Sequence, residues 1–96
     1  MNYEPGRQIW IPCEVKPGPF PDERMVRIDS DGTSWVGFVP VESLQEPVTH
    51  GQTFVRAVIV SVEGKRLAVR VPGEPVASRL AEITQSRVQP LAALQA

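Results

Sequence analysis

The sequence predicts a mainly β fold, a small five-stranded barrel followed by one C-terminal α-helix. Valine dominates the apolar residues, with 14 Val against 5 Leu in 96 residues, and β-branched side chains favour strands. The composition changes near residue 73, since 12 of the valines precede that point and five of the seven alanines follow it. A chain this short has room for one domain. We therefore expect a β-barrel over residues 1–72, with a helix and tail over residues 73–96 that pack on it.

The first strand is expected over residues 8–16, because every second residue from Ile9 to Val15 is apolar. A period of two is typical of a half-buried strand. Pro12 has no N–H for a ladder hydrogen bond, so it indicates a sheet edge or a bulge. The Pro-rich stretch at 16–23 then predicts an extended loop.

The second and third strands form a predicted hairpin. Strands over residues 24–29 and 34–40 flank the dipeptide Asp31-Gly32, and Asp-Gly is a strong signal for a two-residue turn. A short helical turn is expected next, over residues 41–45.

The fourth strand, over residues 53–62, is the longest, and residues 66–71 return beside it after a Gly-containing turn. In the fifth strand, alternate residues from Leu67 to Val71 are expected to face inward. One side of the fourth strand is expected to carry four apolar residues, namely Phe54, Val58, Val60 and Val62.

The C-terminal helix is predicted from a different spacing. Pro75 suits a first helical turn, where its missing N–H costs nothing. Val76, Leu80 and Ile83 form an apolar stripe at helical spacing, and Pro90 ends the helix. We expect this stripe to pack on the barrel, and a surface for a partner is the alternative.

Three segments together carry a resemblance to a known family. They are residues 37–44 (GFVPVESL), 51–60 (GQTFVRAVIV) and 65–70 (KRLAVR). Over residues 34–71 the chain resembles the OB-fold RNA-binding domain that is repeated in a ribosomal small-subunit protein. The resemblance implies a five-stranded barrel that binds RNA.

A Src-homology type barrel is the second family that the sequence resembles. Trp35 and the segment Gly37-Phe38-Val39-Pro40 look like that family's Trp and Gly-x-aromatic-Pro strand, which a helical turn follows. The long hairpin over residues 53–71 fits the OB type better, because the Src-homology barrel has one short closing strand at that point.

Catalysis is the least expected function. Cys13 and His50 are the only residues of their types and lie far apart in the chain. The sequence contains no phosphate-binding loop, no nucleophile elbow and no metal-binding motif. We therefore expect a protein that is not an enzyme and that uses neither a cofactor nor a metal.

The sequence also predicts a protein that stays away from membranes. It has no run of 18 apolar residues, and its first residues lack the basic start and apolar centre of a signal peptide. A single cysteine allows no disulfide within the chain. A reducing, cytoplasmic location is the expectation.

An outer strand face is the candidate nucleic-acid site. An exposed Trp beside cations provides a stacking surface for bases and contacts for phosphates. Strand alternation brings five such residues to this face: Trp10, Lys16, Arg27, Arg66 and Arg70. The expected ligand is RNA or single-stranded DNA. The alternative for Trp10 is burial under the C-terminal helix.

A protein partner is the alternative to nucleic acid. The net charge is -1, and acids scattered along the same strands repel phosphate. Phe20, between two prolines, is a pre-ordered apolar tip for protein binding, and Trp35 is a second candidate contact. The competing interpretation is that Phe20 folds over the barrel mouth and caps the core. An edge strand at Pro12 also predicts pairing between two copies in a homodimer.

Overall fold

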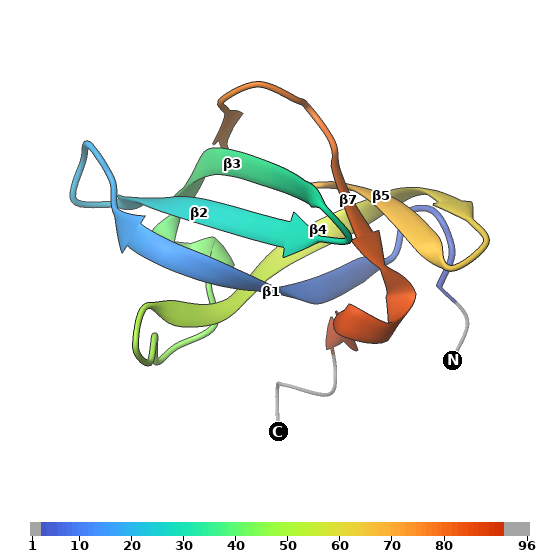
Figure 1. Cartoon of the computed structure of the whole chain (residues 1–96). Coiled ribbons are helices and arrows are strands. Elements are labelled where there is room, and N and C mark those ends of the chain that lie inside the picture. Colours follow the sequence, from blue (N-terminus) through green and yellow to red (C-terminus); the bar gives the residue numbers. More distant parts are fainter. Residues whose placement is uncertain (1–2, 92–96) are drawn as a thin grey trace.

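The computed structural model describes residues 3–91, which form one curled antiparallel sheet with the shape of a half-barrel (Figure 1). Within this range, seven strands run in the spatial order β6-β3-β2-β1-β4-β5-β7, and β8 pairs with β1 off this path. The strands are β1 (Gln8–Pro17), β2 (Glu23–Ser30), β3 (Thr33–Pro40), β4 (Gln52–Glu63), β5 (Arg66–Arg70), β6 (Glu74–Pro75), β7 (Ala81–Thr84) and β8 (Gln89–Pro90). The prediction of a mainly β fold with barrel-like curvature is confirmed.

β1 lies at the centre of the sheet. Residues 8–14 pair with β4, residues 14–17 pair with β2, and residues 9–10 pair with β8. Pro12 falls between the stretches that pair with β8 and β2, so this short part of β1 is a local sheet edge, which suits a residue without an N–H. The predicted edge position is correct for this local stretch and wrong for the strand as a whole.

The β2–β3 hairpin turns at Asp31 and Gly32, as the sequence predicts. Both residues have positive φ angles, 49° and 84°, which a type I′ turn requires at its two central positions. After β3 the chain forms a single-turn 3₁₀ helix at Val41–Ser43, within the helical turn expected over residues 41–45.

The four apolar residues expected on one side of β4 do not share a side. The buried residues of this strand are Val55, Ala57 and Ile59. Ala57 lies opposite the buried Ile9 of β1, so this pairing sets the core-facing side, and Val58 and Val60 are 37% and 36% exposed. A shift of register next to Val60 then returns Val62 to the core side.

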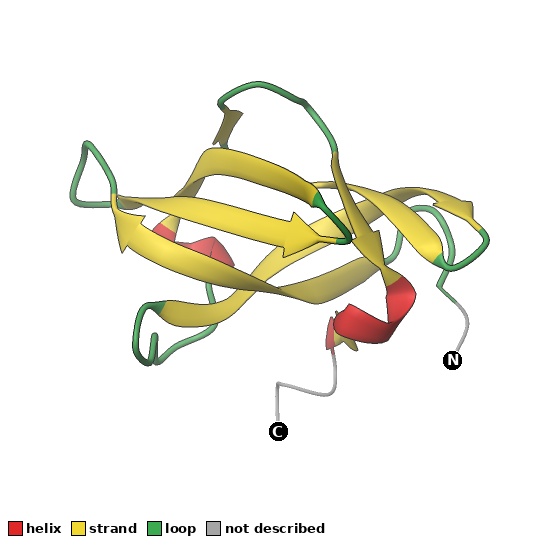
Figure 2. Cartoon of the chain, in the orientation of Figure 1, coloured by secondary structure: helices red, strands yellow, loops and turns green. Residues whose placement is uncertain are grey.

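The predicted C-terminal α-helix is wrong. Residues 74–90 form three short strands and a single-turn 3₁₀ helix, Gln85–Arg87 (Figure 2). Ala81 and Ile83 are buried whereas Glu82 between them is exposed, which is the period of a strand. Pairing of β7 with β5 outweighs helical propensity here, and Val76 of the expected helical stripe is 61% exposed. Within residues 3–91, no helix has the length and apolar character to cross a membrane.

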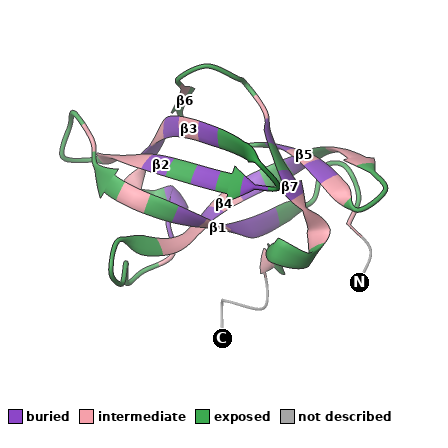
Figure 3. Cartoon of the chain, in the orientation of Figure 1, coloured by how far each residue is buried: buried purple, intermediate pink, exposed green. Residues whose placement is uncertain are grey.

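β7, at one end of the curled sheet, closes against the β2–β3 hairpin. Ser30 is buried, and its hydroxyl accepts a hydrogen bond from the Thr84 amide at 3.2 Å and lies 3.5 Å from the Thr84 hydroxyl. The Thr84 hydroxyl also donates to the carboxylate of Asp31. These side chains therefore join β7 to the end of β2, and the curled strands enclose the apolar core. Figure 3 marks the buried residues along these strands.

Candidate interaction surfaces

Trp10, the expected stacking residue, is buried. Its side chain is 5% exposed, and its Nε1–H donates a hydrogen bond to the Leu91 carbonyl at 3.1 Å. Gln89 of β8 lies opposite Trp10 in the pairing with β1. The C-terminal segment therefore covers the indole, as the alternative interpretation expected, although it does so as a strand and not as a helix. A ring this well covered offers no face to a nucleic-acid base.

Three of the four predicted phosphate-binding cations lie beside a carboxylate. The pairs are Lys16–Glu14 at 3.8 Å, Arg27–Asp29 at 3.0 Å and Arg66–Glu82 at 3.5 Å. Exposed pairs of this kind contribute little to stability. They do place a negative charge next to each cation, where it repels a phosphate group.

The predicted cations also lie on two different parts of the sheet. Lys16 and Arg27 lie on β1 and β2 and line one small hollow together. Arg70 on β5 lies opposite Val58, which in turn lies opposite Gln8. Eight residue steps along β1 separate Gln8 from Lys16, or about 26 Å of strand. The structure therefore brings Lys16 and Arg27 together and places Arg70 elsewhere.

Asp29 is the centre of a hydrogen-bond network at the end of β2. Its carboxylate accepts hydrogen bonds from the Ser34 hydroxyl and from Arg27 Nε, the latter at 3.0 Å, and its carbonyl accepts one from Arg87. The hydrogen bond from Ser34, followed by the one from Arg27, lowers the pKa of Asp29 below its ordinary value. The same carboxylate raises the pKa of Arg27. This network holds the Arg27 guanidinium on the sheet surface and competes with phosphate for it.

Phe20 stands at the tip of a loop whose backbone is held in place. Its side chain is 62% exposed, so the interpretation that it caps the core is wrong. The Glu23 amide donates to the Phe20 carbonyl at 3.1 Å, and the Arg24 guanidinium donates to the Pro21 carbonyl at 2.9 Å. Gly18 packs so closely that a Cβ there would lie 2.7 Å from the Glu23 carbonyl oxygen. This loop, which joins β1 and β2 in Figure 1, presents an apolar side chain from an ordered backbone.

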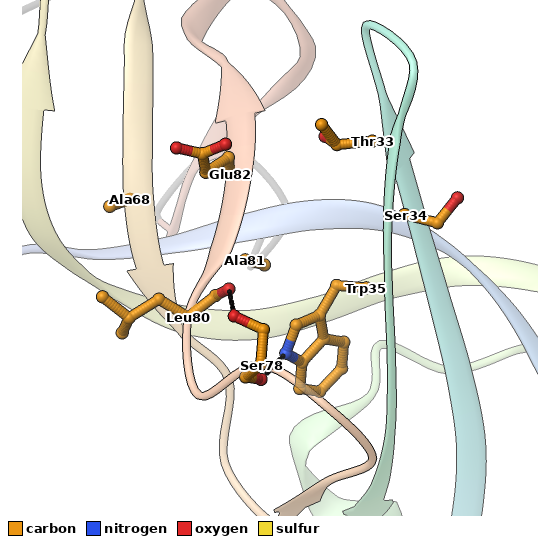
Figure 4. Close-up of a pocket in the computed structure, with 8 residues that line it drawn as sticks. All are labelled: Thr33, Ser34, Trp35, Ala68, Ser78, Leu80, Ala81 and Glu82. Atoms are coloured by element: carbon orange, nitrogen blue, oxygen red, sulfur yellow. Dashed lines mark hydrogen bonds between the residues drawn. The ribbon is translucent and has the colours of Figure 1, made fainter.

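Trp35, the second expected protein contact, forms one wall of a hollow of about 250 Å³ between β3 and β7 (Figure 4). Its side chain is 5% exposed, and its Nε1–H donates to the Ser78 carbonyl at 2.8 Å. The Ser78 hydroxyl donates in turn to the Leu80 carbonyl at 3.0 Å. These bonds hold the loop before β7 against the indole. Trp35 therefore supports the fold and offers little surface to a partner.

The cysteine and the histidine, residue types that often act in catalysis or metal binding, lie in positions that do not suit either role. Cys13 is buried, and the loss of solvent around it raises the pKa of its thiol to about 12. A thiol with this pKa is a poor nucleophile at neutral pH. His50 is an exposed turn residue with a φ of 54°. Within residues 3–91, no group of three His, Cys, Asp or Glu side chains is arranged to hold a metal ion.

Arg56 is the surface residue that sequence reasoning missed. It lines a hollow of about 390 Å³ on the outer face of β4 and β5, together with Arg70 and Val58. The sequence does indicate where Arg56 lies: Arg56 and Val58 are two residues apart on one strand and therefore share a face. The expectation grouped Val58 with three other apolar residues on one side of β4 and did not consider Arg56, which shares that side.

Comparison with known proteins identifies no relative. No protein-family model, no curated protein and no solved structure matches this chain. The chain itself offers two candidate interaction sites, the exposed Phe20 loop and the hollow beside Arg56 and Arg70.

Proposed function

We propose that this protein is a non-catalytic protein-interaction module that binds its partner through Phe20. The observation that carries the proposal is an aromatic side chain, 62% exposed, on a loop whose backbone is held by hydrogen bonds. Burying a Phe side chain against a partner contributes about 1.5–3 kcal/mol. The ordered loop loses little conformational entropy when it binds.

Binding of RNA or single-stranded DNA, which the OB-type resemblance implies, has less support. The half-barrel is compatible with that fold and with other small barrels. The stacking residue Trp10 is buried, and three of the expected cations lie beside carboxylates. A protein fits this mixed surface better, and a second copy of the chain is one such partner. The cytoplasmic location stays a prediction.

The test places the photo-crosslinking residue p-benzoylphenylalanine at position 20 and, as a control, at position 76. Val76 is 61% exposed, so the two positions match in accessibility. With the chain expressed in its source organism, we expect one discrete protein adduct from position 20 alone. An adduct of twice the chain mass identifies a second copy as the partner.

The partner found in this way is then purified and titrated against variants. Phe20→Ser is expected to weaken binding by about 30-fold, as loss of a hot-spot aromatic does, while Val76→Ser changes the Kd by less than about twofold. Equal adducts at both positions, an adduct that nuclease removes, or an unchanged Kd for Phe20→Ser would each contradict the proposal.

A further inference from the structure

A hollow on the outer face of β4 and β5 is lined by two arginine residues. It measures about 390 Å³, and its lining residues are Gln8, Arg56, Ala57, Val58, Arg70 and Pro72. Arg70 lies opposite Val58 in the β4–β5 pairing, and Arg56 lies two residues before Val58 on the same face. Diagonal neighbours of this kind have Cα atoms about 7–8 Å apart. Arg56 and Arg70 are therefore close enough in the sheet to serve one site.

This hollow contains no compensating negative charge. None of its six lining residues is acidic, and the three ion pairs found within residues 3–91 involve neither Arg56 nor Arg70. Two neighbouring guanidiniums without a carboxylate beside them attract an anion more strongly than the paired cations elsewhere on the surface, each of which already lies beside a carboxylate.

The remaining lining residues indicate the kind of anion. Val58, 37% exposed, and Pro72 provide an aliphatic floor, and Gln8 adds a neutral amide. No aromatic side chain lines the hollow, so a nucleic-acid base finds no surface on which to stack. A guanidinium binds a carboxylate through two parallel hydrogen bonds. The lining therefore suits a carboxylate side chain with an aliphatic neighbour.

We infer that this hollow binds an acidic segment of a partner protein, in which Glu or Asp alternates with aliphatic residues. Arg56 and Arg70 hold the carboxylates, and Val58 with Pro72 contacts the aliphatic side chain between them. The site lies beside Gln8 at the first end of β1, whereas the loop of Phe20 follows the other end. The two surfaces are separate, so a negative result for the hollow would not contradict the proposal for Phe20, and the reverse also holds.

The test is a titration of the ¹⁵N-labelled protein, followed by NMR, with a capped Gly-Glu-Val-Glu-Gly peptide. The matched control peptide carries Gln in place of both Glu residues. We expect the acidic peptide to shift the amide resonances of Arg56, Val58 and Arg70. Arg70→Gln is expected to weaken the apparent Kd by about tenfold, and Arg70→Lys by less, because lysine keeps the charge but loses the two-pronged geometry.

Lys16→Gln is the matched charge control, since it removes the same charge at the far end of β1 and is expected to change the Kd by less than about twofold. Unchanged dispersion in the free spectra shows that each variant is folded. Equal shifts with the Gln peptide, or equal weakening by Lys16→Gln and Arg70→Gln, overturn the inference. Tighter binding of a twelve-residue oligothymidylate at the same resonances overturns it in favour of nucleic acid.

Discussion

Both tryptophans are held by backbone carbonyls that lie beyond residue 72. Trp10 donates to the Leu91 carbonyl, and Trp35 donates to the Ser78 carbonyl. A buried indole N–H needs an acceptor, and distant segments of the chain supply it in both cases. Strand alternation identifies the side of a strand on which Trp10 lies but not the segment that covers that side. The stacking role predicted for Trp10 assumed an exposed ring, and the C-terminal segment that covers the ring could not be foreseen from strand alternation.

Gly37 leaves space for the ring of Trp35, and a substitution there tests this packing. A Cβ at position 37 would lie 2.8 Å from Trp35 Cζ2, so Gly37→Ala is expected to reduce the free energy of unfolding by about 2–3 kcal/mol through overpacking. In a Trp35→Phe background the smaller ring leaves room, and the same change is expected to cost less than about 1 kcal/mol. Urea denaturation of the four proteins measures the cycle, and additive effects would count against this packing.

At the scale of elements, the sequence was most informative where the signals are local. The predicted strands over residues 8–16, 24–29, 34–40, 53–62 and 66–71 match β1 to β5 closely. Alternating hydrophobicity and residues suited to tight turns, such as Gly32 and Gly64 with their positive φ angles, act within a few positions of one another. These features need no knowledge of the rest of the fold.

β7 shows where such local reasoning ends. Its segment satisfies two patterns at once, because Leu80 and Ile83 are spaced as on a helix while Ala81 and Ile83 alternate as on a strand. The choice between them depends on β5, whose backbone N–H and C=O groups on the side away from β4 stay unpaired unless another strand pairs there. No spacing within residues 73–90 contains that information, so the helix predicted there was wrong.

The hydroxyl of Ser30 is expected to stabilise β7 at its last residue. Ser30→Ala removes the acceptor of the Thr84 amide, and an amide that loses its partner in a half-buried position costs about 1–2 kcal/mol. Hydrogen exchange at the Thr84 amide should accelerate, and the urea midpoint should fall. Ser86→Ala, at an exposed position, serves as the control. Equal exchange at Thr84 in both variants would show that the contact does not hold the strand.

For the molecule as a whole, the nearly balanced net charge predicted the charge character of the surface better than any single residue did. The near balance of charge reappears in the structure as three cation–carboxylate pairs, which weaken the case for nucleic acid. The proximity of Arg56 and Arg70 could not be predicted from the sequence, because it depends on the register between β4 and β5. Register depends on a bulge near Val60, and nothing in the sequence marks it.

A chain that ends at Pro72 tests whether the segment after it is separable. Because β6, β7 and β8 pair with β3, β5 and β1, this truncation uncovers Trp10 and Trp35, and we expect red-shifted tryptophan fluorescence and loss of cooperative unfolding. A chain that ends at Leu91 keeps every contact described here and is the control. Native-like NMR dispersion in the shorter chain would contradict the expectation.

The hydrogen bond from Trp10 to Leu91 spans 81 positions, and this distance has a consequence for biosynthesis. β1 to β5 leave the ribosome before the segment that covers both indoles and the edge of β5. Until that segment follows, the nascent strands carry an uncovered apolar surface and an unpaired edge, which are the features that promote aggregation. Contacts so distant in sequence also slow folding. The core of this small domain is therefore complete only once the segment after residue 72 has paired with β1, β3 and β5.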